Sequence, residues 1–494
     1  MATFSSQRFL TLEDLKIAFN VFCAVYGVGT LGMPGNFSRA GPFVAVLAMM
    51  LMAFANIYAS VAISRVLLLA PTSVRTYGDL GTWVAGKWGH WLAVVAQMGS
   101  CLLIPCVFLV LGGSLLDGLF PNAFTPTVWI VFMALMCLPV CLIPTLKEGA
   151  GAAFAGCAGT LLADIISVSV VLHGMRGHPA VPRPHLTLSQ VAGVFGNLSL
   201  AYGAGVVIPS LQRQHSDPRR MPRVICCTLT FISCLFLVLA STAYSAVGCQ
   251  LKENLLFTIY PNATTKRTTL GFQPHWGAVV LAYLFMQLHI TIAFSVLLHP
   301  VFYLSERLVL GMHKMKEQGT GRTSDCEYVD IETPSKDSTV SPGSAECHSE
   351  TSFDAQGRTV QHDETEQEAA EYRGANTFKY VLLRLAIITL LVLLSVVLED
   401  HFTNLADFAG ASCISLNSII LPILFRMIKC WPTIPLYEKV LALSVVVICT
   451  LLAGYGTYTS GKTLFARSDA SVLFPFCESE FENQVYYKAT AVNG

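Results

Sequence analysis

Two short stretches decide the fold of this chain: YGVG at residues 26–29, followed by Pro34, and YGAG at residues 202–205, followed by Pro209. Each lies inside a long apolar run. Two glycines one position apart weaken a helix by about 1 kcal/mol each relative to alanine, and proline cannot donate a helical hydrogen bond. Freed backbone groups are tolerated at membrane depth only where they are buried in protein or line a cavity. The two stretches therefore predict two membrane helices that are interrupted part-way across.

The composition is that of a membrane protein. Hydrophobic residues make up 53% of the 494 positions and charged residues only 13%, whereas a soluble domain carries about 25% charged residues. A helix needs about 20 apolar residues to cross the hydrocarbon core, and the apolar runs show no strand-like alternation. We predict eleven helical spans, at residues 15–33, 42–69, 91–119, 128–142, 151–173, 189–211, 224–247, 276–303, 377–397, 405–427 and 440–457.

Charge asymmetry predicts the orientation. Lys and Arg gather in the loops after spans six, eight and ten, which share one side if the N-terminus is cytoplasmic. The loop 249–275 then lies outside and carries the sequon Asn262-Ala-Thr264, which predicts a glycoprotein. Cys249 and Cys477 also fall on the outer side, where a disulfide is permitted. Sequence alone cannot give the distance between these two cysteines.

The predicted organisation has five parts. They are a cytoplasmic N-terminus (1–14), eight spans (15–305), an acidic cytoplasmic loop (306–376), three spans (377–460) and an extracytoplasmic tail (461–494). The loop is rich in Ser, Thr and acidic residues, so it buries too little apolar surface to offset its ordering entropy and is predicted to be disordered. A solvated spacer is the favoured interpretation, with phosphorylation as the alternative.

The two interrupted spans stand in a particular relation. They lie five spans apart and run in opposite directions, which predicts a pair of five-helix inverted repeats with the broken first helices meeting at a binding site. The alternative is that the glycines only allow close helix packing. If they mark unwound segments, their backbone should approach the ligand or adopt angles closed to other residues. Alanine should then impair binding at each of the four glycines.

The first stretch continues as GVGTLGMP (27–34) and FSRAG (37–41) and resembles the first-helix signature of the amino acid/auxin permease family. PTLKE (144–148), PSLQ (209–212) and LPILF (421–425) are similar to further features of that family. The resemblance implies the leucine-transporter-like fold: an all-α integral membrane protein whose eleven helices form a 5+5 inverted repeat plus one extra helix. It also implies amino acid transport coupled to protons or sodium. The chain departs from the family at Cys23, where many members have Asn, and at Asn36.

Ionisable and hydroxyl groups within the spans are candidates for ion coupling. Asp164 lies midway along the fifth span, where a carboxyl is costly and therefore suggests function; a structural hydrogen-bonded role is the alternative. His289 is a weaker proton carrier and is expected mainly to pack. Thr291 and Ser295 lie one turn apart, and the resemblance implies that eighth-helix hydroxyls help bind sodium; they could equally bond back to their own helix. Asn20, one turn before Cys23, completes the ion-coupling set.

The leading hypothesis is alternating-access transport of an amino acid (symport with H⁺ or Na⁺). The substrate carboxylate would meet amides near residues 27–30 at a half-helix N-terminus, and its amine would meet carbonyls near Tyr202 and Gly203. The predicted substrate-binding residues are Tyr26, Gly27, Val28, Gly29, Thr30, Tyr202, Gly203, Ala204 and Gly205. The alternative is an amino acid-sensing receptor without net transport.

Other classes of function find no support in the sequence. It contains no metal-ligand spacing, nucleophile motif or phosphate-binding loop, so we expect neither an enzyme nor a bound cofactor or metal. Lys+Arg and Asp+Glu balance at 31 each, which argues against nucleic-acid binding. The expected partners are an amino acid and membrane lipid. The expected location is the plasma membrane or an endomembrane such as the vacuole or lysosome.

Overall fold

The computed structural model describes residues 9–71, 73–74, 76–143, 149–177, 182–312, 372, 374–465 and 472–483. The chain divides into two compact units, Met1–Val301 with Ile387–Gly494, and Phe302–Ala386. The motif at residues 144–148 and most of the predicted acidic loop lie outside the described residues.

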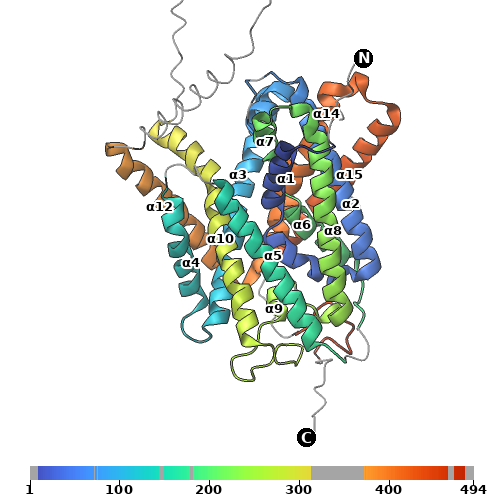
Figure 1. Ribbon diagram of the computed structural model, residues 1–494, viewed down its shortest axis with the longest axis vertical. Helices are drawn as coiled ribbons and strands as arrows, with labels where there is room; N and C mark the ends of the chain where they lie inside the picture. Colours follow the sequence, from blue (N-terminus) through green and yellow to red (C-terminus); the bar gives the residue numbers. More distant parts are fainter. Residues whose placement is uncertain are drawn as a thin grey trace, which may run out of the picture. The chain divides into compact units, whose positions relative to one another are not determined.

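Helices dominate the described part of the chain (Figure 1), which confirms the all-α fold class. In chain order they are α1 (Leu12–Val25), η1 (Val28–Gly32), α2 (Met33–Leu69), α3 (Tyr77–Leu119), α4 (Pro126–Cys141), α5 (Gly149–Gly174), α6 (Leu188–Ala201), α7 (Ile208–Gln214), η2 (Pro218–Arg220), α8 (Met221–Val247), η3 (Gly248–Gln250), α9 (Leu255–Thr258), α10 (Trp276–Ser305), η4 (Glu306–Leu310), α12 (Ala375–Val397), η5 (Glu399–His401), α13 (Phe402–Ala409), η6 (Gly410–Ile414), η7 (Leu416–Ile420), α14 (Leu421–Cys430), η8 (Trp431–Thr433) and α15 (Leu436–Leu464).

Eight helices in the described residues are long and apolar enough to cross a membrane, and α4 and α6 are apolar but shorter. The predicted number of eleven spans is not settled by this count. Part of the first predicted span runs into the second within α2, where Gly41 (φ 72°) only kinks the helix. The sixth predicted span is divided between α6 and α7.

Two predicted spans differ in their local structure. α3 begins at Tyr77, well before the predicted start at residue 91, because Thr76 and Asp79 form a capping box. Its first part is then set off by a bend at Ala85 and Gly86 (φ 64°). The tenth predicted span contains two π-helical segments, η6 and η7, in which the hydrogen bonds skip an extra residue.

The helical backbone runs past residue 306, the predicted start of the acidic loop, because η4 continues it to Leu310. Glu306 is fully buried within the unit Phe302–Ala386. Its carboxylate accepts hydrogen bonds from Arg384 Nε at 2.7 Å and from the Tyr372 hydroxyl at 2.8 Å. A buried charge is tolerated when it is paired in this way. Neither Glu306 nor Arg384 stood out in the sequence, because both lie at the edges of apolar runs.

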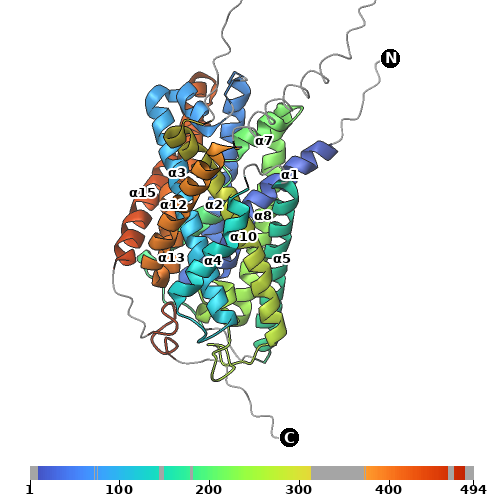
Figure 2. The ribbon, with the colours of Figure 1, turned by 90° about the vertical axis from the view of Figure 1, so that its left-hand side faces the viewer.

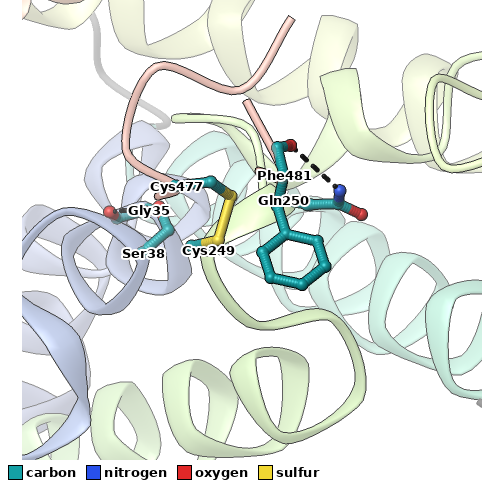
Figure 3. The surroundings of a disulfide bond; sticks show 6 residues. All are labelled: Gly35, Ser38, Cys249, Gln250, Cys477 and Phe481. Carbon is teal, nitrogen blue, oxygen red and sulfur yellow. Dashed lines mark hydrogen bonds between the residues drawn. A yellow bond between two sulfur atoms is a disulfide. The ribbon is translucent and has the colours of Figure 1, made fainter. Parts of the chain in front are cut away.

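Cys249 and Cys477 are joined by a disulfide, with their Cα atoms 5.2 Å apart (Figure 3). The bond ties the segment 472–483 to η3, and the Gln250 side-chain amide donates to Phe481 O at 3.4 Å beside it. The disulfide joins the two cysteines that the sequence analysis placed together on the outer side of the membrane.

We expect Cys477→Ser to lower stability by about 2–4 kcal/mol, because the bond closes a long loop in the unfolded chain. The melting temperature of the purified protein should fall, and a reducing agent should have the same effect on the wild type. Cys430→Ser, which removes a free thiol, is the control. A melting temperature insensitive to both the substitution and the reductant would contradict this expectation.

Asn262 is exposed in the loop before α10. Its Oδ1 accepts from the Thr264 N–H at 2.9 Å and from the Thr264 hydroxyl at 2.7 Å. Two further sequons begin at Asn36 and Asn197. Asn36 is fully buried in α2, and the Asn197 side-chain amide donates to Gly32 O at 3.1 Å from within α6.

Treatment with a glycosidase is therefore expected to shift the electrophoretic mobility of the protein, and Asn262→Gln should abolish the shift. Asn197→Gln should leave it unchanged. Modification of the 249–275 loop by a reagent confined to the cytoplasm of sealed cells would contradict both the glycosylation and the predicted orientation.

Candidate functional site

The first predicted interruption is present between α1 and α2. α1 ends at Val25, and the helical hydrogen bonds resume in η1, where Thr30 N–H donates to Gly27 O at 3.0 Å. Pro34 then lies in the first turn of α2, where its missing N–H costs nothing. The break therefore falls where the two glycines and the proline predicted it.

Asp164 of α5 lies against this break. Its Oδ2 accepts from the Tyr26 hydroxyl at 2.8 Å, and its Oδ1 accepts from the Thr30 hydroxyl at 3.3 Å. The carboxyl is 1% exposed, and no cation of the described residues forms an ion pair with it. Tyr26 caps α1 and Thr30 lies in η1, so the carboxyl connects the two sides of the break. This contact joins three of the residues singled out from sequence.

His289 of α10 approaches the same break. Its Nδ1 lies 3.1 Å from Gly156 O of α5, and its Nε2 lies 3.0 Å from the point where a side chain at Gly27 would begin. Phe108 packs its ring edge-on against the imidazole. His289 therefore packs between α5 and the break.

The second predicted interruption separates α6 from α7. α6 ends at Ala201, Ala204 N–H donates to Tyr202 O at 2.6 Å, and Pro209 lies in the first turn of α7. The N–H of Gly205 faces the Ser418 hydroxyl at 3.4 Å. The break is therefore held against η7, in the π-helical part of the tenth predicted span.

Phe236 of α8 joins the two breaks and was not predicted. Its ring centroid lies 5.8 Å from that of Tyr26 and 5.3 Å from that of Tyr202. The Tyr202 hydroxyl donates to Ser233 Oγ at 2.8 Å, one turn earlier on α8. Nothing in the sequence distinguished Phe236 from the other aromatic residues of that apolar run.

None of the four break glycines has a positive φ, so a steric need for glycine there can come only from close approach. A Cβ on Gly29 would lie 2.7 Å from Ala201 Cα, and one on Gly205 would lie 2.7 Å from Asn417 O. A Cβ on Gly203 would lie 3.4 Å from Ile414 Cγ2 and 3.5 Å from Leu200 O, which are ordinary contact distances. Space is available at Gly203, so the structure gives no steric reason for the cost that was expected of alanine at all four positions.

Other predicted residues are not drawn into this cluster. The Thr291 and Ser295 hydroxyls donate to Gln287 O and Ile292 O of their own helix, which is the back-bonding alternative. Asn20 is half-buried on α1 and makes no hydrogen bond with another described residue. The side chain of Val28 lies outside the described part. Of the predicted ion-coupling residues, Asp164 is the one that hydrogen-bonds to the residues of a break.

One end of α2 is held by an ion pair that the sequence analysis missed. Arg39 Nη1 lies 2.8 Å from Asp407 Oδ2 of α13, and Arg39 Nη2 lies 3.8 Å from Glu253. Asp407 is 4% exposed. Glu253 also lines a cavity of about 500 Å³. Its lining includes Glu253 and Thr403 but none of the break residues, so it is separate from the breaks.

The N-terminal end of α1 is held by a second cluster. The buried Asp14 carboxylate accepts from Arg220 Nη2 at 2.6 Å and faces His215 Nε2 at 2.9 Å. The Asp217 N–H donates to His215 Nδ1 at 3.0 Å, so Nε2 carries the proton that is donated to Asp14. Asp14 precedes the first predicted span, and the hydrogen bond from Arg220 lowers the pKa of its carboxyl well below the ordinary value.

This depressed pKa predicts how the cluster responds to acid. Its stabilisation is fully present above the pKa of a free aspartate, about 3.9, and is lost only as the pH falls through the lower value of the folded protein. The loss of melting temperature caused by Arg220→Gln should therefore be constant down to about pH 3.9 and shrink below it. Arg219→Gln, in the same segment, is the control. A loss that does not change on acidification would contradict the role of Asp14.

Two interrupted helices packed among apolar spans define a multi-pass membrane protein of the leucine-transporter-like fold. The fold is shared with the crystal structure of MhsT in complex with L-phenylalanine, at a TM-score of 0.51 and 11% identity over 90% of this chain and 98% of that one. The chain belongs to the family described as transmembrane amino acid transporter protein, which it matches over residues 13–461. The predicted family resemblance is thereby confirmed, and the family is one of transporters, not enzymes.

Two curated relatives show how far the likeness extends. Amino acid transporter AVT1J of Arabidopsis thaliana is 23% identical over 257 residues, covering 49% of this chain and 59% of the relative. Vacuolar amino acid transporter 4 of Saccharomyces cerevisiae is 22% identical over 262 residues, covering 50% of this chain and 36% of the relative. The chain thus spans about half the length of the curated relatives it matches.

Proposed function

We propose that the protein is a secondary active transporter that moves amino acids across a membrane by alternating access, coupled to protons. One observation carries the proposal: the buried Asp164 carboxyl bridges the two sides of the first helix break through Tyr26 and Thr30. A buried carboxyl without a cationic partner is costly when ionised. Gain or loss of a proton at Asp164 would therefore change the energy of the break itself.

The substrate site is proposed at the two breaks. Backbone groups near residues 27–30 and 202–205 would bind the carboxylate and amine of an amino acid, since interrupted helices expose such groups. Phe236 lies between Tyr26 and Tyr202 and would form an aromatic wall for the substrate side chain. The names of the family and of the relatives support an amino acid as the substrate class.

The geometry favours protons over sodium as the coupling ion. Sodium binding at the eighth helix would use the oxygen lone pairs of Thr291 and Ser295, whose hydroxyls donate to carbonyls of their own helix and make no hydrogen bond to a break residue. The side chain of Asp164, by contrast, is a titratable carboxyl that hydrogen-bonds to both sides of the first break. Sodium coupling is the alternative, and uptake measured with and without sodium distinguishes the two.

Alternating access requires that each end can close. The Arg39–Asp407 pair holds one end of the core and the Asp14–Arg220 pair holds the other, which supports a closed state with Asp164 shielded from both sides. The vacuolar relative supports an endomembrane location, such as a vacuole or lysosome.

An uptake screen tests the proposal. Purified protein in liposomes would be offered each common amino acid at two pH values, with and without sodium. We expect saturable uptake of a subset, stimulated by a proton gradient and independent of sodium. Saturable binding without flux would instead identify an amino acid-sensing receptor, and the absence of both binding and flux would contradict the assignment of the site.

A further inference from the structure

Four of the six tryptophans of the chain lie on α3 or at the turn between α14 and α15. They are Trp83, Trp88, Trp91 and Trp431. Trp88 is 87% exposed, and Trp91 and Trp431 are at least half exposed. Tryptophan concentrates at membrane–water interfaces, where its ring sits at the level of the lipid headgroups.

A fixed bend in α3 positions three of these rings. Gly86 takes a positive φ of 64°, and a Cβ on Gly81 would lie 2.4 Å from Gly89 O. The parts of α3 before and after the bend therefore pack backbone to backbone, as only glycines allow. Trp83 comes before the bend and Trp88 after it, so their positions are set by the helix rather than by a flexible loop.

Two lysines lie on the faces of two of these rings. Lys429 Nζ is 4.2 Å from the Trp83 ring centroid, and Lys439 Nζ is 4.6 Å from that of Trp431. The first pair joins α14 to α3, the helix labelled at the upper left of Figure 2. Within the described residues, neither ammonium has a carboxylate within ion-pair distance.

The neighbouring charges do not supply a counter-ion. Glu438 is already paired with Arg426 at 2.6 Å and accepts from the Tyr58 hydroxyl at 3.3 Å. Lys87, exposed between Trp83 and Trp88, adds a further positive charge. Asp79, in the first turn of α3, accepts from the Thr76 N–H in the capping box. Among the described residues, Lys87, Lys429 and Lys439 therefore place positive charge beside the aromatic rings at this end.

An apolar surface continues from the charged one. Along the start of α15, Leu436 is 76% exposed, Tyr437 is 77% exposed and Val440 is 59% exposed. A ligand that matches both parts has a negative headgroup and a long apolar chain. Soluble anions match only the first part, and neutral lipids lack the charge.

We propose that Trp83, Lys87, Trp88, Lys429, Trp431 and Lys439, here called the tryptophan–lysine surface, bind the headgroup of an anionic phospholipid. The lysines contact the phosphate and the tryptophan rings lie against the glycerol and upper acyl chain. Each lysine of this surface should raise the affinity of the protein for an anionic phospholipid about fivefold.

The surface is connected to the second helix break. The Tyr77 hydroxyl, on the same first part of α3 as Trp83, donates to Asn417 O at 2.7 Å. Asn417 O is also the atom that a Cβ added to Gly205, in the break between α6 and α7, would approach most closely. A lipid that steadies α3 would therefore steady one wall of the break. This effect rests on the proposed function, whereas the lipid binding itself does not.

Lipid retention by the purified full chain tests the binding without reference to transport. Protein would be equilibrated with equal amounts of phosphatidylserine and phosphatidylcholine, and the bound lipid counted by native mass spectrometry. We expect preferential retention of phosphatidylserine, reduced about 25-fold by the double substitution Lys429→Gln and Lys439→Gln. The double substitution to Arg should retain the lipid, because charge and ring contact both remain.

The control is Lys252→Gln, which removes a lysine that also lies over a ring, that of Phe474, in the loop before α9. It should leave lipid retention unchanged. Equal retention of the two lipids, or retention unaffected by the double Gln substitution, would overturn the proposal. Displacement of the lipid by inorganic phosphate would overturn it in favour of a free-anion site. Loss of lipid stimulation of uptake in the double Gln variant, with uptake in phosphatidylcholine unchanged, would support the connection to the break.

Discussion

Asp164→Asn is expected to reduce proton-driven net uptake to background while leaving exchange of substrate across the membrane intact. Asn has nearly the same shape, and its carbonyl oxygen can still accept from Tyr26 or Thr30. It cannot carry a proton, so the break would no longer sense the gradient. Uptake into proteoliposomes with an imposed pH gradient, compared with counterflow of labelled substrate, separates the two processes.

Two further variants sharpen this test. Tyr26→Phe removes one donor and keeps the ring beside Phe236, so it should weaken coupling less than Asp164→Asn does. Asp117→Asn, which changes a carboxyl on α3 away from the break, should leave uptake unchanged. Equal uptake by wild type and Asp164→Asn under a proton gradient would show that Asp164 has only a structural role.

Gly29→Ala is expected to abolish uptake, whereas Gly203→Ala should be nearly silent. A methyl group on Gly29 would lie 2.7 Å from the backbone Cα of Ala201, and backbone cannot move aside as a side-chain end can. Overpacking of this kind costs about 1–3 kcal/mol and shifts the backbone. A methyl group added to Gly203 would lie 3.4 Å from the nearest atom, Ile414 Cγ2, so it fits without a clash. Alanine there also lowers the conformational entropy of the unfolded chain, which favours the folded state.

The two glycines form a matched pair, since the same methyl group is added at each break. Uptake kinetics and melting temperature should be measured for both variants, with the amount of membrane protein as a reference. Gly205→Ala should behave like Gly29→Ala, because Asn417 O lies 2.7 Å from its added methyl group. Normal uptake by Gly29→Ala would contradict the close packing of η1 against α6, and with it the placement of the site.

The parts of the fold that could be predicted from sequence are those encoded locally. Paired glycines with a following proline predicted both breaks, and an acid within an apolar run identified Asp164. A disulfide between Cys249 and Cys477 could be suggested because the predicted orientation places both cysteines on the outer side of the membrane, where disulfides can form. Each of these signals depends on a short window of residues or on a simple exclusion.

The features that were missed depend on pairing across the fold. Phe236 has no local signature, and it matters only because Tyr26 and Tyr202 converge on it. Arg39 and Asp407 lie 368 residues apart, so no short window could reveal their ion pair. The hydroxyls of Thr291 and Ser295 show the reverse case: their spacing suggested an ion site, whereas in the structure they donate to carbonyls of their own helix and do not hydrogen-bond to the breaks.

The most direct test of the central claim is the proton movement that accompanies substrate uptake. Purified protein would be sealed in sodium-free liposomes containing a pH-sensitive dye, and an amino acid identified in the uptake screen would be added outside. The account predicts acidification of the lumen that follows substrate entry in the wild type and is absent in Asp164→Asn. Substrate uptake with no change of internal pH, or acidification that persists in Asp164→Asn, would contradict it.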